Sequence, residues 1–213
     1  MKKNINEVVV SDIRMNVKHV RIFIEGDGDL VLNKMNARSI RALTGGRKKV
    51  REEPNPWEDL ITAIHWRDPL PFKDSYKECS EEWMYKLLKE NAPCITAFGI
   101  KKSIGEAVVR NEIDKYKTKL ENAINIIAPR GLIPVTFAEW GYEEKLMSPK
   151  KGAPVTVRLN HFCGWKADFQ MDYTDHVYNL DQLVSFINMA GFGLGIGSGR
   201  TSGYGRYHVV DVK

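Results

Sequence analysis

A chain of 213 residues with 43% hydrophobic residues is long enough to bury a core and too apolar to be disordered. Lysine and arginine outnumber aspartate and glutamate by 32 to 27, and this modest excess fits an anionic partner. No apolar run approaches the roughly 18 residues of a membrane span, and the N-terminus lacks a signal-peptide core, so we expect a cytoplasmic protein without membrane contact.

The cysteines argue against a disulfide scaffold. Cys79, Cys94 and Cys163 are odd in number and far apart, which favours a reducing compartment. No C-x-x-C or H-x-x-x-H spacing occurs, so we expect no metal site and no cofactor.

The N-terminal part begins with a strand and continues into a basic stretch. Alternating apolar residues predict a strand over residues 17–24, and residues 25–29 predict a turn. Residues 34–51 contain basic residues and no acid, with Gly45 and Gly46 among them. This composition predicts a flexible basic arm, either a solvated loop or a segment that contacts phosphate. Its basic residues are Lys34, Arg38, Arg41, Arg47, Lys48, Lys49 and Arg51.

Helix-capping signals dominate the next part of the chain. Asn55 followed by Pro56 predicts a helix to about residue 64. Ser80 opens a helix that ends before Pro93, and Thr96 opens a third, which carries Lys101 and Lys102 on its outer side. Apolar spacing over residues 113–127 predicts one long amphipathic helix.

The second half is richer in strands. Residues 132–138, 155–159 and 165–173 predict strands, the first two separated by a loop with Pro149, Gly152 and Pro154. Asn179 and Gln182 form a capping box for a helix that Gly191 would end as its C′ residue. Residues 206–212 predict the last strand.

This order corresponds to the β-α-β-β-α-β order of a ferredoxin-like, RRM-like fold. We therefore predict an α+β protein with helices on one face of an antiparallel sheet. Residues 1–213 would form a single domain with a helical and basic insertion at about residues 30–95. The uncovered face of such a sheet binds nucleic acid in many proteins.

Glycine is concentrated just before the last strand. Residues 191–205 hold seven of the 17 glycines of the chain. No G-x-G-x-x-G fits the run, Arg200 stands where a P-loop needs lysine, and the helix–loop–strand context is the reverse of both nucleotide-binding motifs. The glycines therefore serve either close approach to a ligand or only a hairpin that brings the last strand into the sheet.

The loop resembles one known family. Gly195-Ile196-Gly197, five residues that include Arg200, and then Gly203-Tyr204-Gly205 resemble the glycine-rich loop of the RAMP superfamily, the ferredoxin-like RNA-binding proteins of CRISPR effector complexes. The resemblance implies that residues 195–205 and the basic helix end at Lys101 and Lys102 contact the RNA backbone. Residues 30–35, 98–102 and 188–197 are similar to small uncharacterised phage and prophage proteins, which implies a phage-encoded protein.

The residues themselves support nucleic-acid binding. Loop N–H groups, Arg200 and Arg206 can bind phosphate, and Phe192, Tyr204 and Tyr207 can stack on unpaired bases. The leading interpretation is a non-enzymatic binder of single-stranded RNA or DNA that assembles along the strand.

Two alternatives from other classes remain open. One is a metal-independent endoribonuclease that uses a histidine, for which His65 and His161 are the loop candidates. The other is a CRISPR-subunit mimic that acts through protein contacts.

Overall fold

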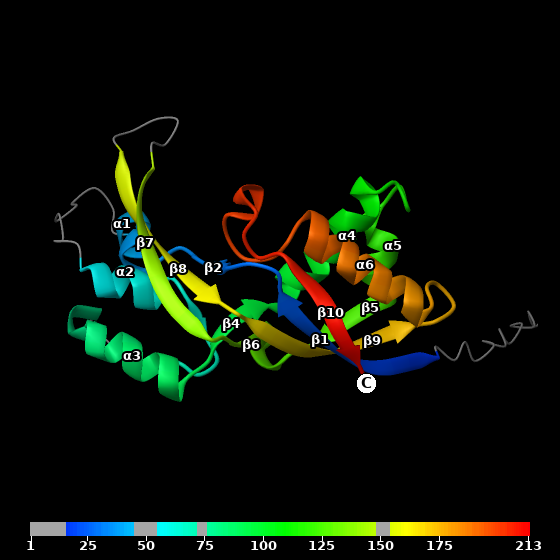
Figure 1. The fold of residues 1–213 in the computed structure, drawn as a ribbon, viewed down its shortest axis with the longest axis horizontal. Coiled ribbons are helices and arrows are strands. Elements are labelled where there is room, and N and C mark those ends of the chain that lie inside the picture. Colours follow the sequence, from blue (N-terminus) through cyan, green and yellow to red (C-terminus); the bar gives the residue numbers. More distant parts are fainter. Residues whose placement is uncertain (1–15, 45–54, 72–75, 148–153) are drawn as a thin grey trace, which may run out of the picture.

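The protein has an α+β fold built from antiparallel strands, as the sequence predicts (Figure 1). The structure is a computed structural model that describes residues 16–44, 55–71, 76–147 and 154–213. Arg47, Lys48 and Lys49, predicted to contact nucleic acid, lie outside the described residues.

The larger sheet runs through the middle of the molecule. Its strand order is β10-β1-β9-β6-β4-β3, and β5 also pairs with β9. The strands are β1 (Val17–Gly26), β3 (His65–Trp66), β4 (Pro93–Thr96), β5 (Ile124–Ile127), β6 (Leu132–Thr136), β9 (Lys166–Thr174) and β10 (Tyr207–Val212).

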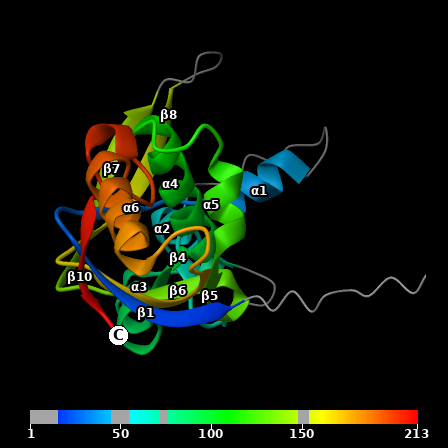
Figure 2. The same cartoon turned by 90° about the vertical axis from the view of Figure 1, so that its right-hand side faces the viewer.

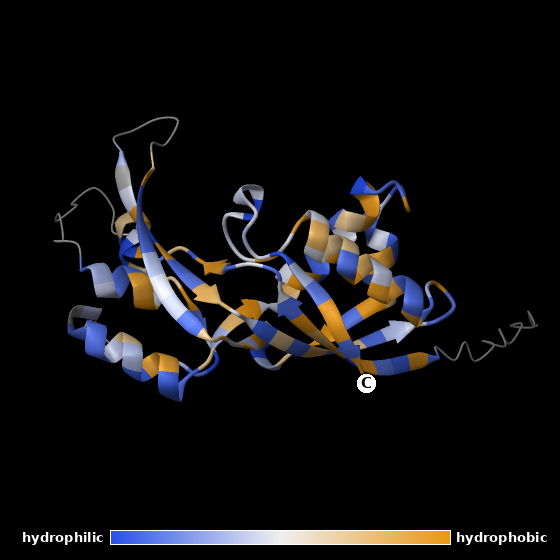
Figure 3. Ribbon diagram, viewed as in Figure 1, coloured by the Kyte–Doolittle hydropathy of each residue, from blue (hydrophilic) through white to orange (hydrophobic). Residues whose placement is uncertain are grey.

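Three helices cover one face of this sheet: α4 (Ala97–Arg110), α5 (Lys117–Ala123) and α6 (Leu180–Gly193) (Figure 2). Hydropathy alternates along β9, so alternate side chains point into the core (Figure 3). Ile22 of β1, Ile104 of α4 and Ile187 of α6 are among the buried residues. Burial of each such side chain stabilises the fold by about 1.5–3 kcal/mol.

A second, three-stranded sheet lies at the end of the molecule opposite α4, α5 and α6 (Figure 1). Its strand order is β2-β8-β7. Helices α1, α2 and α3 lie at the same end of the molecule (Figure 1). These elements are β2 (Leu30–Leu32), α1 (Ala37–Thr44), α2 (Pro56–Thr62), α3 (Glu81–Glu90), β7 (Glu139–Met147) and β8 (Val155–Cys163). Short 3₁₀ turns occur at η1 (Tyr76–Glu78), η2 (Pro129–Gly131) and η3 (Arg200–Ser202).

The predicted helix starts are confirmed at atomic detail. The Asn55, Ser80 and Thr96 side chains accept hydrogen bonds from first-turn N–H groups of α2, α3 and α4. At α6, Asn179 and Gln182 form the predicted capping box. Each cap satisfies N–H groups that have no partner within the helix.

The long helix predicted over residues 113–127 is wrong. Residues 117–123 form the short helix α5, and the chain then becomes strand β5, which pairs with β9. Ile124 and Ile126 are buried while Asn125 and Ile127 are exposed. This period of two suits a strand, although the same isoleucines also fit a helical spacing.

Other boundaries also differ from the predictions. Residues 37–44 of the predicted flexible arm form helix α1, and residues 139–147 of a predicted loop form β7. Pro149 and Gly152 of that loop lie outside the described residues. Gly191 does not end its helix, which continues to Gly193. A Cβ at Gly191 would overlap the carbonyl oxygen of Tyr207, so this glycine lets β10 pack directly against the helix.

Candidate nucleic-acid interface

The glycine loop, residues 195–205, depends on left-handed backbone angles. The φ values of Gly195, Gly197 and Gly203 are 71°, 77° and 89°, and Gly199 and Gly205 are also positive. Only glycine adopts such angles without a steric penalty. Backbone conformation therefore explains most of the glycine concentration.

Much of the hydrogen-bonding capacity of this loop is used inside the protein. The N–H group of Ile196 donates to the Gly205 carbonyl at 2.9 Å, that of Ser198 to Val31 at 2.8 Å, and that of Gly205 to Asp29 at 2.8 Å. These N–H groups are not free to bind phosphate. The loop thus joins the ends of the two sheets, and the hairpin alternative accounts for part of its glycine content.

One side of the loop borders a pocket of about 230 Å³, here called the loop pocket. Four separate segments of the chain form it: the end of β2 with the residues after it, the start of β3, strand β4 with the first turns of α4, and the glycine loop. Its lining residues include Lys34, His65, Thr96, Lys102, Ser198 and Arg200.

The electrostatics of the loop pocket favour an anion. No carboxylate is among the described residues that line it. Lys34 and Arg200 make no ion pair within the described parts of the chain, and Lys102 lies 3.8 Å from Glu106. Loss of water contact lowers the pKa of Lys34. An anion placed here would restore the interactions that these cations lack.

The same pocket holds one histidine. Burial, and after it the charge of Lys34, lowers the pKa of His65 below its usual value of about 6.5. The imidazole is therefore neutral near pH 7 and able to accept a proton.

Several predicted site residues face the protein instead of the pocket. Lys101 donates from Nζ to the Ile124 carbonyl at 2.9 Å, and Arg206 donates from Nη2 to the Arg200 carbonyl at 3.4 Å. Tyr204 is half-buried, with its ring 5.2 Å from that of His161. Tyr207 is fully buried under α6, which raises its pKa, so its predicted stacking role is wrong.

The described arginines of the basic arm are already paired. Arg38 donates from Nε to Asp59 at 2.9 Å, and Arg41 lies 2.7 Å from Glu58. Both carboxylates are buried, and α1 is held against α2 by these pairs. Most of the positive charge of these two arginines is thus neutralised within the protein.

Two exposed aromatic rings belong to helices that adjoin the glycine loop or its pocket. Phe192, predicted as a stacking residue, is 86% exposed at the end of α6. Phe98 is 74% exposed in the first turn of α4, beside the lining residue Gly99. Phe98 is not among the site residues that the sequence predicts. The sequence pattern that could have identified it is a phenylalanine on the outer side of the helix that also carries Lys101 and Lys102.

The sequence predicts His161 in a loop, but the residue lies on strand β8. Its Nδ1 is 3.3 Å from Asp29 and its Nε2 is 3.5 Å from Glu143. The side chain is largely buried between these carboxylates, away from the loop pocket lining.

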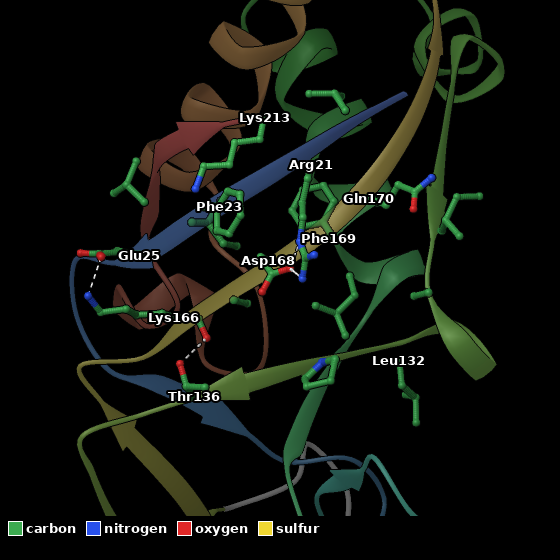
Figure 4. A pocket seen from close by; sticks show the side chains of 18 of the residues that line it. Arg21, Phe23, Glu25, Leu132, Thr136, Lys166, Asp168, Phe169, Gln170 and Lys213 are labelled. Carbon is green, nitrogen blue, oxygen red and sulfur yellow. Dashed lines mark hydrogen bonds and ion pairs between the residues drawn. The ribbon is translucent and has the colours of Figure 1, made fainter. Parts of the chain in front are cut away.

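The helix-free face of the larger sheet carries a concavity of about 720 Å³ (Figure 4). Its cations are paired: Arg21 donates to Asp168 and Lys166 to Glu25. Lys213 lies over the Phe23 ring, 4.8 Å from its centroid, and also pairs with Asp211. This face therefore offers less unpaired positive charge than the loop pocket does.

Two further features concern metals, thiols and membranes. Among the described residues, no group of three or more histidine, cysteine or acidic side chains is arranged to hold a metal ion.

All three cysteines are free thiols, and burial raises the pKa of the Cys79 thiol to about 12. No helix in the described part of the chain has the length and apolar character to cross a membrane.

Comparison with known proteins identifies similar structures but no family. No family model matches the chain, and no curated protein matches it. A chain in a cryo-EM structure of the type III-B Cmr-beta complex bound to cognate target RNA is 11% identical, with a TM-score of 0.49. That comparison covers 92% of this chain, which spans 60% of the other.

Cmr6 from Pyrococcus furiosus is 10% identical, with a TM-score of 0.41. The comparison covers 92% of this chain and 100% of Cmr6. At these scores the similarities do not establish a family.

Proposed function

We propose that this protein binds single-stranded nucleic acid, RNA or DNA, through the loop pocket. The observation that carries the proposal is the convergence of Lys34, Lys102 and Arg200 from three distant segments on a pocket without a lining carboxylate. Of these cations, Lys34 and Arg200 have no ion pair within the described residues and Lys102 is 3.8 Å from Glu106. Cations gathered in this way stabilise phosphate groups through charge-assisted hydrogen bonds. The positive end of the α4 helix dipole lies at the same pocket and adds to the effect.

We also propose a RAMP-like architecture for the chain. The strand order β10-β1-β9-β5 with α4 and α6 on one face corresponds to a ferredoxin-like unit, and the glycine loop lies between its last helix and last strand. In this proposal residues 1–213 form one domain, with an insertion at about residues 30–95. The loop spacing described above supports the same relationship.

Single strands are the preferred ligand in this proposal. Phe98 and Phe192 offer exposed ring faces on which unpaired bases stack, whereas bases in a duplex already stack on each other. The basic arm, including Arg38 and Arg41, contributes less to binding than the loop pocket does. Its described arginines are already paired with carboxylates of the protein.

The test is polynucleotide binding by purified Arg200→Ala, with single- and double-stranded RNA and DNA. We expect the variant to lose about 1.5–3 kcal/mol of binding free energy to single strands with its melting temperature unchanged. Arg21→Ala is the matched control, because Arg21 lies on the helix-free face and is paired with Asp168. Wild-type affinity in Arg200→Ala, or a loss only in Arg21→Ala, would contradict the proposal.

A second candidate function is endoribonuclease activity. It is favoured by one observation, the position of neutral His65 in the loop pocket, where it could act as a general base. In that case His65→Ala would abolish cleavage of a bound RNA and leave its affinity unchanged. A protein that binds no naked nucleic acid would instead fit a mimic that works through protein contacts.

A further inference from the structure

The far end of α4 forms a second concavity, of about 450 Å³. The last turns of α4, the connection that follows and the first turn of α5 enclose it. Its lining residues are Glu106, Val109, Arg110, Lys115, Tyr116, Lys117 and Thr118. None of them belongs to the loop pocket.

An exposed aromatic ring lines this concavity. Tyr116 is 60% exposed and occupies the N-cap position of α5, where its side chain makes no capping hydrogen bond. The Lys115 ammonium lies 5.3 Å from the centroid of its ring. The ring is outside the buried core and has an accessible face beside a cation. This combination suits a nucleobase with its phosphate.

Two cations near Tyr116 are available to bind phosphate. Arg110 and Lys115 make no ion pair within the described parts of the chain. Of the nearby acids, Asp114 is engaged by Lys119 at 3.1 Å and by the Tyr178 hydroxyl at 3.0 Å. The remaining acids are Glu106 and Glu121, which lie near Lys102 and Lys117, and Glu112, which is exposed.

One face of α4 connects this concavity to the loop pocket. Lys102 lines the loop pocket, whereas Glu106 and Arg110, four and eight residues later, line the second concavity. Residues at this spacing share a helix face, and eight residues correspond to about 12 Å along the axis. A single strand bound at the glycine loop can therefore follow α4 to Tyr116.

We propose that this concavity is a second contact for the same strand. A base stacks on Tyr116, and Arg110 and Lys115 bind the flanking phosphates. The inference rests on the proposed function, because it concerns the path of the strand that the loop pocket binds.

The test compares oligonucleotides of about 4 and about 12 nucleotides, which span the site sizes usual for single-strand binders. We expect Tyr116→Ala to weaken binding of the longer oligomer about 5- to 150-fold and to leave the shorter one unchanged. Tyr116→Phe keeps the ring face and should bind both like wild type. Arg110→Ala should reduce the salt slope for the longer oligomer by about 0.7.

The outcomes separate the two proposals. If wild type binds both oligomers and Tyr116→Ala changes neither affinity, the second contact does not exist and the proposed function stands. An equal loss at both lengths also overturns the inference, because it reports a general effect on the fold. If wild type binds neither oligomer, both proposals fail.

Discussion

Gly203 and Gly205 belong to the same loop but have left-handed angles for different reasons. At Gly203 φ is 89°, and nothing lies within 4 Å of where a Cβ would be. At Gly205 φ is 70°, and a Cβ would overlap the Ile196 carbonyl oxygen. The first glycine satisfies only a backbone angle, whereas the second also permits two backbone segments to touch.

This difference predicts the order of two substitutions. Gly203→Ala should lower the free energy of unfolding by about 1–2 kcal/mol, the cost of a left-handed alanine. Gly205→Ala should lower it further, because the Ile196 carbonyl must also move. Urea denaturation of both variants measures the order, and equal losses would contradict the close packing seen at Gly205.

At the scale of elements, α1 and α2 are joined to β8 through one buried carboxylate. Asp59 is 3% exposed and accepts hydrogen bonds from Asn36 at 2.9 Å, Arg38 at 2.9 Å and Arg158 at 3.3 Å. A buried charge is tolerated only with such partners. Loss of this carboxylate would leave two arginines without their shared acceptor.

We therefore expect Asp59→Asn to destabilise the protein by about 3–5 kcal/mol, the range for breaking a buried ion pair. Asp68→Asn is the matched control, because Asp68 is exposed in its pairs with Arg67 and Arg130, and it should cost about 0–1 kcal/mol. Chemical denaturation measures both. Similar losses of unfolding free energy in the two variants would show that the Asp59 cluster contributes little to stability.

The elements that sequence reasoning found are those whose signals are local. A capping side chain such as Thr96 or Asn179 acts within its own first turn, so α4 and α6 begin where predicted. Strand β7 was missed because most of its side chains are exposed and their hydropathy does not alternate. Its strand conformation comes from pairing with β8.

The candidate site was predicted only in part, for a related reason. Arg200 and Lys102 were named because a loop spacing and a charged helix end are visible in the sequence. Lys34 was noted in the basic arm, but its convergence with His65 and Arg200 on one pocket is a consequence of tertiary packing. Likewise, only the folded chain shows that the N–H group of Gly205 is bound to Asp29.

At the scale of the whole molecule, α1 leaves apolar side chains uncovered at the end that carries the smaller sheet. Ile40 and Leu43 are exposed, and Leu43 reaches 72%. Exposed apolar residues gathered on one helix are typical of interaction surfaces. If copies assemble along one strand, as the sequence predicts, we expect these side chains to lie in the contact between neighbouring copies.

Light scattering with an oligomer of about 30 nucleotides tests this assembly, since single-strand binders usually occupy several nucleotides each. Wild type should place several copies on one strand, and the double variant Ile40→Asp, Leu43→Asp should place fewer with the loop pocket intact. A wild-type complex with a single protein per strand would contradict assembly.

The position of β1 also affects how the protein can fold during its synthesis. Ile24 pairs with Ala167 on one side and with Val209 on the other, so an early strand lies between two late ones. At about 5–20 residues per second, a ribosome needs roughly 10–40 s to synthesise these 213 residues. During most of that time the nascent chain presents β1 with neither neighbour, exposed to chaperones and to unwanted strand pairing.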